Sequence, residues 1–172
     1  MAPTIPAAWL RAVLSAIPFP GRWLSPLLAA LGARVRYPTG RTTIALRRWG
    51  FRVEIRRYTD LIQRHLFFLG YFEPREARFV RSILREGDTV VDVGANIGWY
   101  TLLAARAVGA SGRVVAFEPA TPAHDHLRHH VALNGFDNVT ILKLGLSHAD
   151  DRLRLGYPDP DNAGALLVVG LD

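Results

Sequence analysis

The sequence predicts an α/β fold in which helices connect the strands of a parallel sheet. The chain has 172 residues and is 49% apolar, which is enough to bury one domain-sized core. Thr89–Val93 is a continuous apolar run, as expected for a strand buried on both faces of a parallel sheet. After it, strand and helix patterns alternate at spacings typical of crossover units.

The first third of the chain predicts two short helices, at about Ala7–Ile17 and Pro26–Leu31. Residues 5–33 are rich in apolar side chains, but arginines and prolines interrupt them before they reach the length of a membrane span. We therefore expect no transmembrane segment and docking of these helices on the protein's own surface. Weak peripheral membrane contact through residues 5–33 is the alternative.

A small β-hairpin and two helices are expected next. Apolar and charged residues alternate over 51–55, which is the pattern of a half-buried strand, and Gly50 marks the turn before it. Asp60 caps a helix that ends at Gly70, and Pro74 opens another that ends before Gly87.

The remaining elements are the strands and helices of the parallel sheet, followed by a pair of strands. We expect a strand at Thr89–Val93, a helix at 97–108, a strand at Arg113–Phe117, a helix ending at Asn134 and Gly135, a strand at 139–144, and paired strands at 152–157 and 165–172. The expected division of the chain is N-terminal helices and hairpin at 1–58, a helical lead-in at 59–87, and a cofactor-binding domain at 88–172.

Charge and cysteine usage limit the partners. The net charge is +6, and ten arginines with a single acid lie in the chain up to Arg57. Arginine dominates throughout and no aromatic-interleaved nucleic-acid module is visible, so nucleic acid is not an expected partner. The absence of cysteine excludes disulfides and thiolate metal sites, and we expect a cytoplasmic protein.

The most informative motif is the loop after Thr89–Val93, which includes Asp92, Gly94, Ala95, Asn96 and Gly98. It has neither the G-x-G-x-x-G of a dinucleotide site nor the Lys-Ser/Thr of a P-loop. An acid at the strand tip would repel a pyrophosphate but attract a cation. The ammonium group of S-adenosylmethionine is such a cation, and Gly94 lets the backbone approach a ligand closely.

A second acid, Glu118, ends the next strand and follows Gly98 by twenty residues. A carboxylate at this place can accept hydrogen bonds from the two ribose hydroxyls of an adenosine. Each acid alone could equally be a helix cap or a solvated strand end. Two acids and two glycines within one strand–turn–helix–strand unit favour an S-adenosylmethionine site.

The chain resembles the FkbM family of S-adenosylmethionine-dependent methyltransferases over residues 60–164. The matching stretches begin at GYFEPREARF, GRVVAFEPAT and NVTILKLGLS and continue to Asn162-Ala163-Gly164. The resemblance implies a Rossmann-like class I methyltransferase sheet and O-methylation of a hydroxyl on a sugar, polyketide or related metabolite. It also implies that the loop binds the methionine part, that Glu118 binds the ribose, and that Leu146 or Ser147 lies near the adenine.

Only the first half of a class I sheet is expected here, because the chain reaches Asp172 before a fourth and fifth strand of the core. The sequence therefore leads to the hypothesis of a C-terminally truncated reading of a longer protein. No residue has the spacing of a catalytic base, so the catalytic residues are left open. The sequence also leaves the oligomeric state open.

Four histidines lie in the second core helix, and His126 and His130 are one turn apart, as two metal ligands would be. With no cysteine and no third ligand, we expect no metal site and a solvated helix face that carries His126 and His129. Two other functions stay open: a non-catalytic nucleotide-binding or scaffold protein with a degenerate Rossmann-like fold, and a nicotinamide-dependent oxidoreductase.

Overall fold

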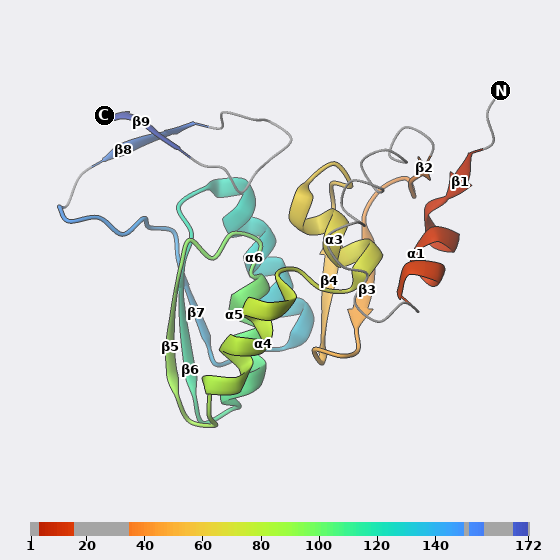
Figure 1. The fold of residues 1–172 in the computed structure, drawn as a ribbon. Coiled ribbons are helices and arrows are strands. Elements are labelled where there is room, and N and C mark those ends of the chain that lie inside the picture. The colour runs from red at the N-terminus through yellow and green to blue at the C-terminus, as the bar shows by residue number, and fades with distance from the viewer. Residues whose placement is uncertain (1–3, 16–34, 150–151, 157–166, 172) are drawn as a thin grey trace. The chain divides into compact units, whose positions relative to one another are not determined.

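The computed structural model describes residues 4–15, 35–149, 152–156 and 167–171 (Figure 1). Residue contacts divide the chain into two units. The first comprises residues 1–44 and 54–72, and the second comprises 45–53 and 73–172. No helix among the described residues is long and apolar enough to cross a membrane.

The first unit is built on two helices, α1 (Ala7–Ser15) and α3 (Leu61–Leu69), which pack against each other. The guanidinium of Arg11 lies 5.5 Å from the ring centre of Phe67, a cation–π contact between these helices. Before α1, β1 (Ile5–Pro6) pairs in parallel with β2 (Val35–Arg36). The expected helix at Pro26–Leu31 lies outside the described residues.

The caps of α3 form where the sequence places them. The side chain of Asp60 accepts a hydrogen bond of 2.9 Å from the backbone N–H of Gln63, which satisfies one free amide of the first turn. The helix ends at Gly70, whose φ of 73° is the left-handed conformation of a glycine cap.

The expected hairpin is present as β3 (Thr42–Leu46) and β4 (Phe51–Ile55), joined by a turn that ends at Gly50. Gly50 has a φ of 79°, which explains why glycine is used there. The turn and the adjoining strand residues, 45–53, group with the second unit, and the rest of the hairpin groups with the first.

The second unit contains a three-stranded parallel sheet in the order β5 (Thr89–Val93), β6 (Arg113–Phe117), β7 (Val139–Leu142). The crossovers are α5 (Trp99–Val108) and α6 (Thr121–Asn134), and α4 (Pro74–Ile83) precedes β5 and packs on α5. This is one half of a Rossmann-like doubly wound sheet, which confirms the α/β prediction.

The prediction that β5 is buried on both faces is wrong. Val91 and Val93 are 57% and 58% exposed. The strands are added in one direction, and right-handed crossovers then place α5 and α6 on the same face of the sheet (Figure 1). Among the described residues, β5 is an edge strand and one sheet face has no helical cover.

The core of this unit lies between the sheet and its helices. Two clusters of buried side chains form it, one of Ala104, Ala105, Val108 and Val114 and the other of Ala95, Ala116 and Leu127. Further along the chain, β8 (Leu153–Gly156) and β9 (Leu167–Leu171) pair antiparallel, as the sequence predicts.

The expected solvated histidine face of α6 is also wrong. His126 and His130 are only 3% and 1% exposed, and their rings lie 4.2 Å apart between centroids. The ring nitrogen Nδ1 of His130 is 2.7 Å from the carbonyl oxygen of Ile97 in the glycine loop. This helix therefore packs on the loop as well as on the sheet, which buries residues that a single apolar stripe leaves outside.

Candidate cofactor site

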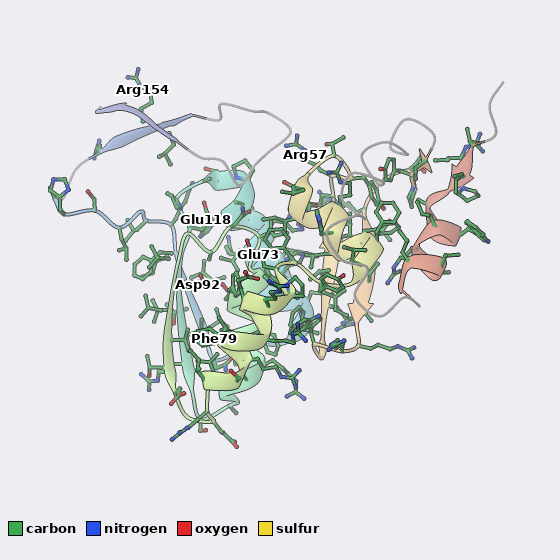
Figure 2. All side chains as sticks on the ribbon, in the orientation of Figure 1. Arg57, Glu73, Phe79, Asp92, Glu118 and Arg154 are labelled. Atoms are coloured by element: carbon green, nitrogen blue, oxygen red, sulfur yellow. The ribbon has the colours of Figure 1, made fainter. Side chains whose placement is uncertain are left out.

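The parallel pairing of β5 and β6 brings the two predicted acids to the same edge of the sheet. Val93 is in register with Phe117, so the glycine loop starts beside the residue that precedes Glu118. The amides of Gly94 and Ala95 both donate to the carbonyl oxygen of Phe117, each at 2.9 Å. Figure 2 shows Asp92, Glu118 and Glu73 near this end of the sheet.

Glu118 holds the loop and its own strand end together. It is 5% exposed; Oε2 accepts from the N–H of Asn96 at 2.7 Å and Oε1 accepts from the N–H of Ala120 at 2.8 Å. A carboxylate has about four acceptor positions, and these amides take two. One position on each oxygen is thus left for a pair of neighbouring hydroxyls.

Glycine is required at the two loop positions for different structural reasons. Gly94 has a φ of 75°, and a Cβ placed there would meet no atom within 4 Å. Gly98 has a φ of 94°, and a Cβ there would lie 2.5 Å from Cδ1 of the buried Leu127. Gly98 permits close packing of α5 on α6, whereas Gly94 leaves open space at the mouth of the loop.

The loop amides are directed into the protein. The N–H groups of Gly94, Ala95, Asn96 and Gly98 all donate to protein oxygens: the carbonyl of Phe117, the Glu118 carboxylate and the carbonyl of Ala95. A pyrophosphate loop instead presents such amides to its ligand. This geometry disfavours a dinucleotide site and agrees with the acid at the strand tip.

Asp92 accepts a hydrogen bond of 2.5 Å from the hydroxyl of Thr101, in the first turn of α5. Burial raises the pKa of Asp92, and the hydrogen bonds from Thr101 partly oppose that rise. Sequence reasoning missed Thr101. The available signal was a hydroxyl in an otherwise mainly apolar helix, nine residues after the acid.

The raised pKa of Asp92 predicts a pH-dependent stability. Because the folded state binds this proton more tightly, the associated stabilisation is complete below the unfolded pKa of 3.8 and is lost as pH rises through the raised folded pKa. The free energy of unfolding of the wild type and of Asp92→Asn can be measured in urea from below pH 3.8 up to pH 7. As the pH is lowered, the wild type should gain stability relative to the variant. A pH-independent difference in the free energy of unfolding would contradict this.

Tyr100 and Glu73 form a second pair beside the loop that sequence reasoning did not join. The Tyr100 hydroxyl donates to Oε2 of Glu73 at 2.6 Å. Burial, this hydrogen bond and the nearby carboxylates of Glu73, Glu76 and Asp92 all raise the pKa of Tyr100, so its hydroxyl stays protonated. Glu73 has a left-handed backbone, with a φ of 44°, at the start of α4.

Trp99, which follows the second loop glycine, and Ser147, which the resemblance places near the adenine, lie in different surroundings. Trp99 is buried and makes edge contacts with Trp49 and Phe51, so it belongs to the core. Ser147 lies in the exposed segment after β7, and its hydroxyl is 3.5 Å from Nδ1 of the adjacent His148. A role of Ser147 near an adenine stays a prediction.

Fold and site together define a Rossmann-like unit with one acid at the end of each of two neighbouring strands. No family model matches the chain. Two curated relatives are methyltransferases. A protein-L-isoaspartate O-methyltransferase of Archaeoglobus fulgidus is 36% identical over 59 residues, which are 34% of this chain and 27% of the relative. The methyltransferase sdnD of Sordaria araneosa is 39% identical over 69 residues, or 40% and 26%.

The matched segments thus cover about a quarter of the length of each curated relative. Among solved structures, an S-adenosylmethionine-dependent O-methyltransferase of Thermotoga maritima is 29% identical, with a TM-score of 0.42 over 48% of this chain and 32% of that one. A structure from Clostridium thermocellum, described as an rRNA methylase, is 30% identical, with a TM-score of 0.41 over 42% of this chain and 41% of that one.

Proposed function

We propose that the chain forms the cofactor-binding part of an S-adenosylmethionine-dependent methyltransferase of the FkbM type, which transfers a methyl group to a hydroxyl of a sugar, polyketide or related metabolite. The observation that carries the proposal is Glu118, a buried carboxylate at the end of β6 with an acceptor position left on each oxygen. The similarity of part of the chain to two methyltransferases supports it.

The residues present fit the two ends of this cofactor. Glu118 can accept from both ribose hydroxyls while it keeps its two backbone bonds. Asp92, in its partly buried position, can pair with the ammonium group, and Gly94 leaves the space that the methionine part needs. Ala95, Asn96 and Gly98 shape the loop between these contacts.

When bound, S-adenosylmethionine supplies a methyl group on a positively charged sulfur. That methyl group would be the electrophile offered to an acceptor hydroxyl, whose proton would leave to a base or to water. Asp92 and Glu118 contribute by fixing both ends of the cofactor, which reduces the entropy cost of aligning the methyl group with the acceptor.

Calorimetric titration of the chain with S-adenosylmethionine and, separately, with NAD tests the cofactor. We expect binding of S-adenosylmethionine and none of NAD. Transfer of labelled methyl groups to a panel of sugar and polyketide hydroxyls then tests the enzyme. Binding without transfer to any acceptor would favour the scaffold function, and preference for NAD would favour an oxidoreductase; either result would contradict the proposal.

The affinity for S-adenosylmethionine should weaken as pH falls through the raised pKa of Asp92. Only the ionised carboxylate attracts the ammonium group, so this loss should begin at a higher pH than an ordinary aspartate would give. Calorimetric titrations between neutral pH and the unfolded pKa would measure it. Asp92→Asn should bind weakly at every pH, and a variant that kept the wild-type pH profile would refute the assignment.

A further inference from the structure

Four exposed arginines line a cavity of about 470 Å³ that is open to solvent, in the second unit. Its walls come from the hairpin turn, the last turns of α4 and α5, and the apolar side chains of Trp49, Leu84 and Leu103. The arginines are Arg47 and Arg48 in the turn, Arg81 on α4 and Arg106 on α5.

This cavity is separate from the cofactor site. The glycine loop leads into the first turn of α5 at Trp99, whereas Arg106 lies in the last turn of the same helix. Seven residues of α-helix separate them, a rise of about 10 Å along the axis. A ligand in the cavity would therefore not compete with the contacts of Asp92 and Glu118.

The arginine side chains are placed by contacts with the hairpin turn. Nη1 of Arg81 donates to the carbonyl oxygen of Arg48 at 3.3 Å. Arg106 lies against Gly50, where a Cβ would be 3.1 Å from its Nε. Arg81 and Arg106 lie in the last turns of their helices, where the helix dipole stabilises a positive charge. Arg47 and Arg48 lie in the hairpin turn, so a helix dipole does not explain their positions.

The lining of the cavity carries several positive charges. None of its nine residues is acidic. Within the described part of the chain, Arg47, Arg81 and Arg106 take part in no ion pair. Guanidinium groups match the geometry of phosphate oxygens and bind them with two parallel hydrogen bonds, so several of them around one cavity favour a multiply charged phosphate.

We propose that this cavity binds the phosphate groups of a small molecule that carries a diphosphate or a similarly charged group. Its volume suits a small ligand, and its four guanidiniums match a ligand with several negative charges. The site stands independently of the proposed methyl transfer, since it uses none of the same residues.

Calorimetric titration of the full chain with inorganic pyrophosphate, and in parallel with a nucleoside diphosphate, tests this proposal. We expect saturable binding of pyrophosphate and at least a tenfold loss of affinity in the double variant Arg47→Gln/Arg106→Gln, because each removes a charge-assisted contact. Tighter binding of the nucleoside diphosphate would show that the ligand includes a nucleoside. Equal binding would place recognition in the phosphates alone; both results support the proposal.

The charge-matched control is Arg75→Gln/Arg128→Gln, two exposed arginines of α4 and α6 outside the cavity. This control should bind pyrophosphate as the wild type does, and circular dichroism should show all variants folded. Equal losses of pyrophosphate affinity in the two double variants would show that net charge alone causes the effect, and would overturn the proposal. Failure of the wild type to bind pyrophosphate, or binding of RNA without pyrophosphate, would overturn it as well.

Discussion

Glu118→Ala is expected to weaken the binding of S-adenosylmethionine about a hundredfold or more. The variant loses two hydrogen bonds from ribose hydroxyls to a charged acceptor, each worth about 1.5 kcal/mol or more. It also leaves the amides of Asn96 and Ala120 without their acceptor, so the loop loses one of its hydrogen bonds to the end of β6 and keeps those of Gly94 and Ala95 to Phe117. Calorimetric titration of both proteins at neutral pH measures the loss.

Two further variants separate the ligand contact from the structural one. Glu118→Gln keeps one acceptor oxygen and the side-chain length, so its affinity should fall between those of alanine and wild type. Asp125→Ala removes an exposed carboxylate from α6 nearby and should leave the affinity unchanged. If Asp125→Ala cost as much affinity as Glu118→Ala, the ribose assignment would be wrong.

Gly98→Ala is expected to lower the free energy of unfolding by about 3 kcal/mol, which combines left-handed backbone strain with overpacking. The added Cβ would lie 2.5 Å from Cδ1 of Leu127, and this side chain is fully buried and has little room to move. Urea unfolding measures the loss. Adding Leu127→Ala should relieve the overpacking part, so the two substitutions should be non-additive.

Gly94→Ala is the matched comparison, because Gly94 also has a positive φ but no neighbour within 4 Å of the added carbon. It should cost only about 1 kcal/mol of stability. Its affinity for S-adenosylmethionine should nevertheless fall strongly, because the methyl group would occupy the space next to Asp92. Equal stability losses in the two glycine variants would show that close packing at Gly98 is not limiting.

Local sequence patterns were sufficient for most elements of the second unit. β5 and β6 have the predicted bounds, and α6 ends at Asn134 with Gly135 as its cap, as expected. Glycine allows left-handed backbone at helix ends and turns, proline fixes φ at the start of a helix, and apolar periodicity marks a strand or helix within a few residues. β7 was predicted to end at Leu144 but ends at Leu142, because the two residues after Leu142 have no partner on β6.

Burial was predicted less well, because it depends on which elements meet. One apolar stripe on α6 suggested that His126 faces solvent, but the helix also packs on the glycine loop and buries it. The apolar run of β5 suggested two covered faces, but both crossover helices lie on one side. In each case the deciding neighbour comes from a distant part of the chain.

The sequence alone predicted that Asp92, Glu118 and the two loop glycines lie together, because a strand–turn–helix–strand unit brings its strand ends to one edge of the sheet. Only the tertiary structure decided what these residues do there. It showed that Glu118 accepts a hydrogen bond from the Asn96 amide of the loop, that Thr101 donates one to Asp92, and that Gly98 packs on Leu127. These contacts depend on strand register and helix packing, which are set by distances in space that no sequence spacing encodes.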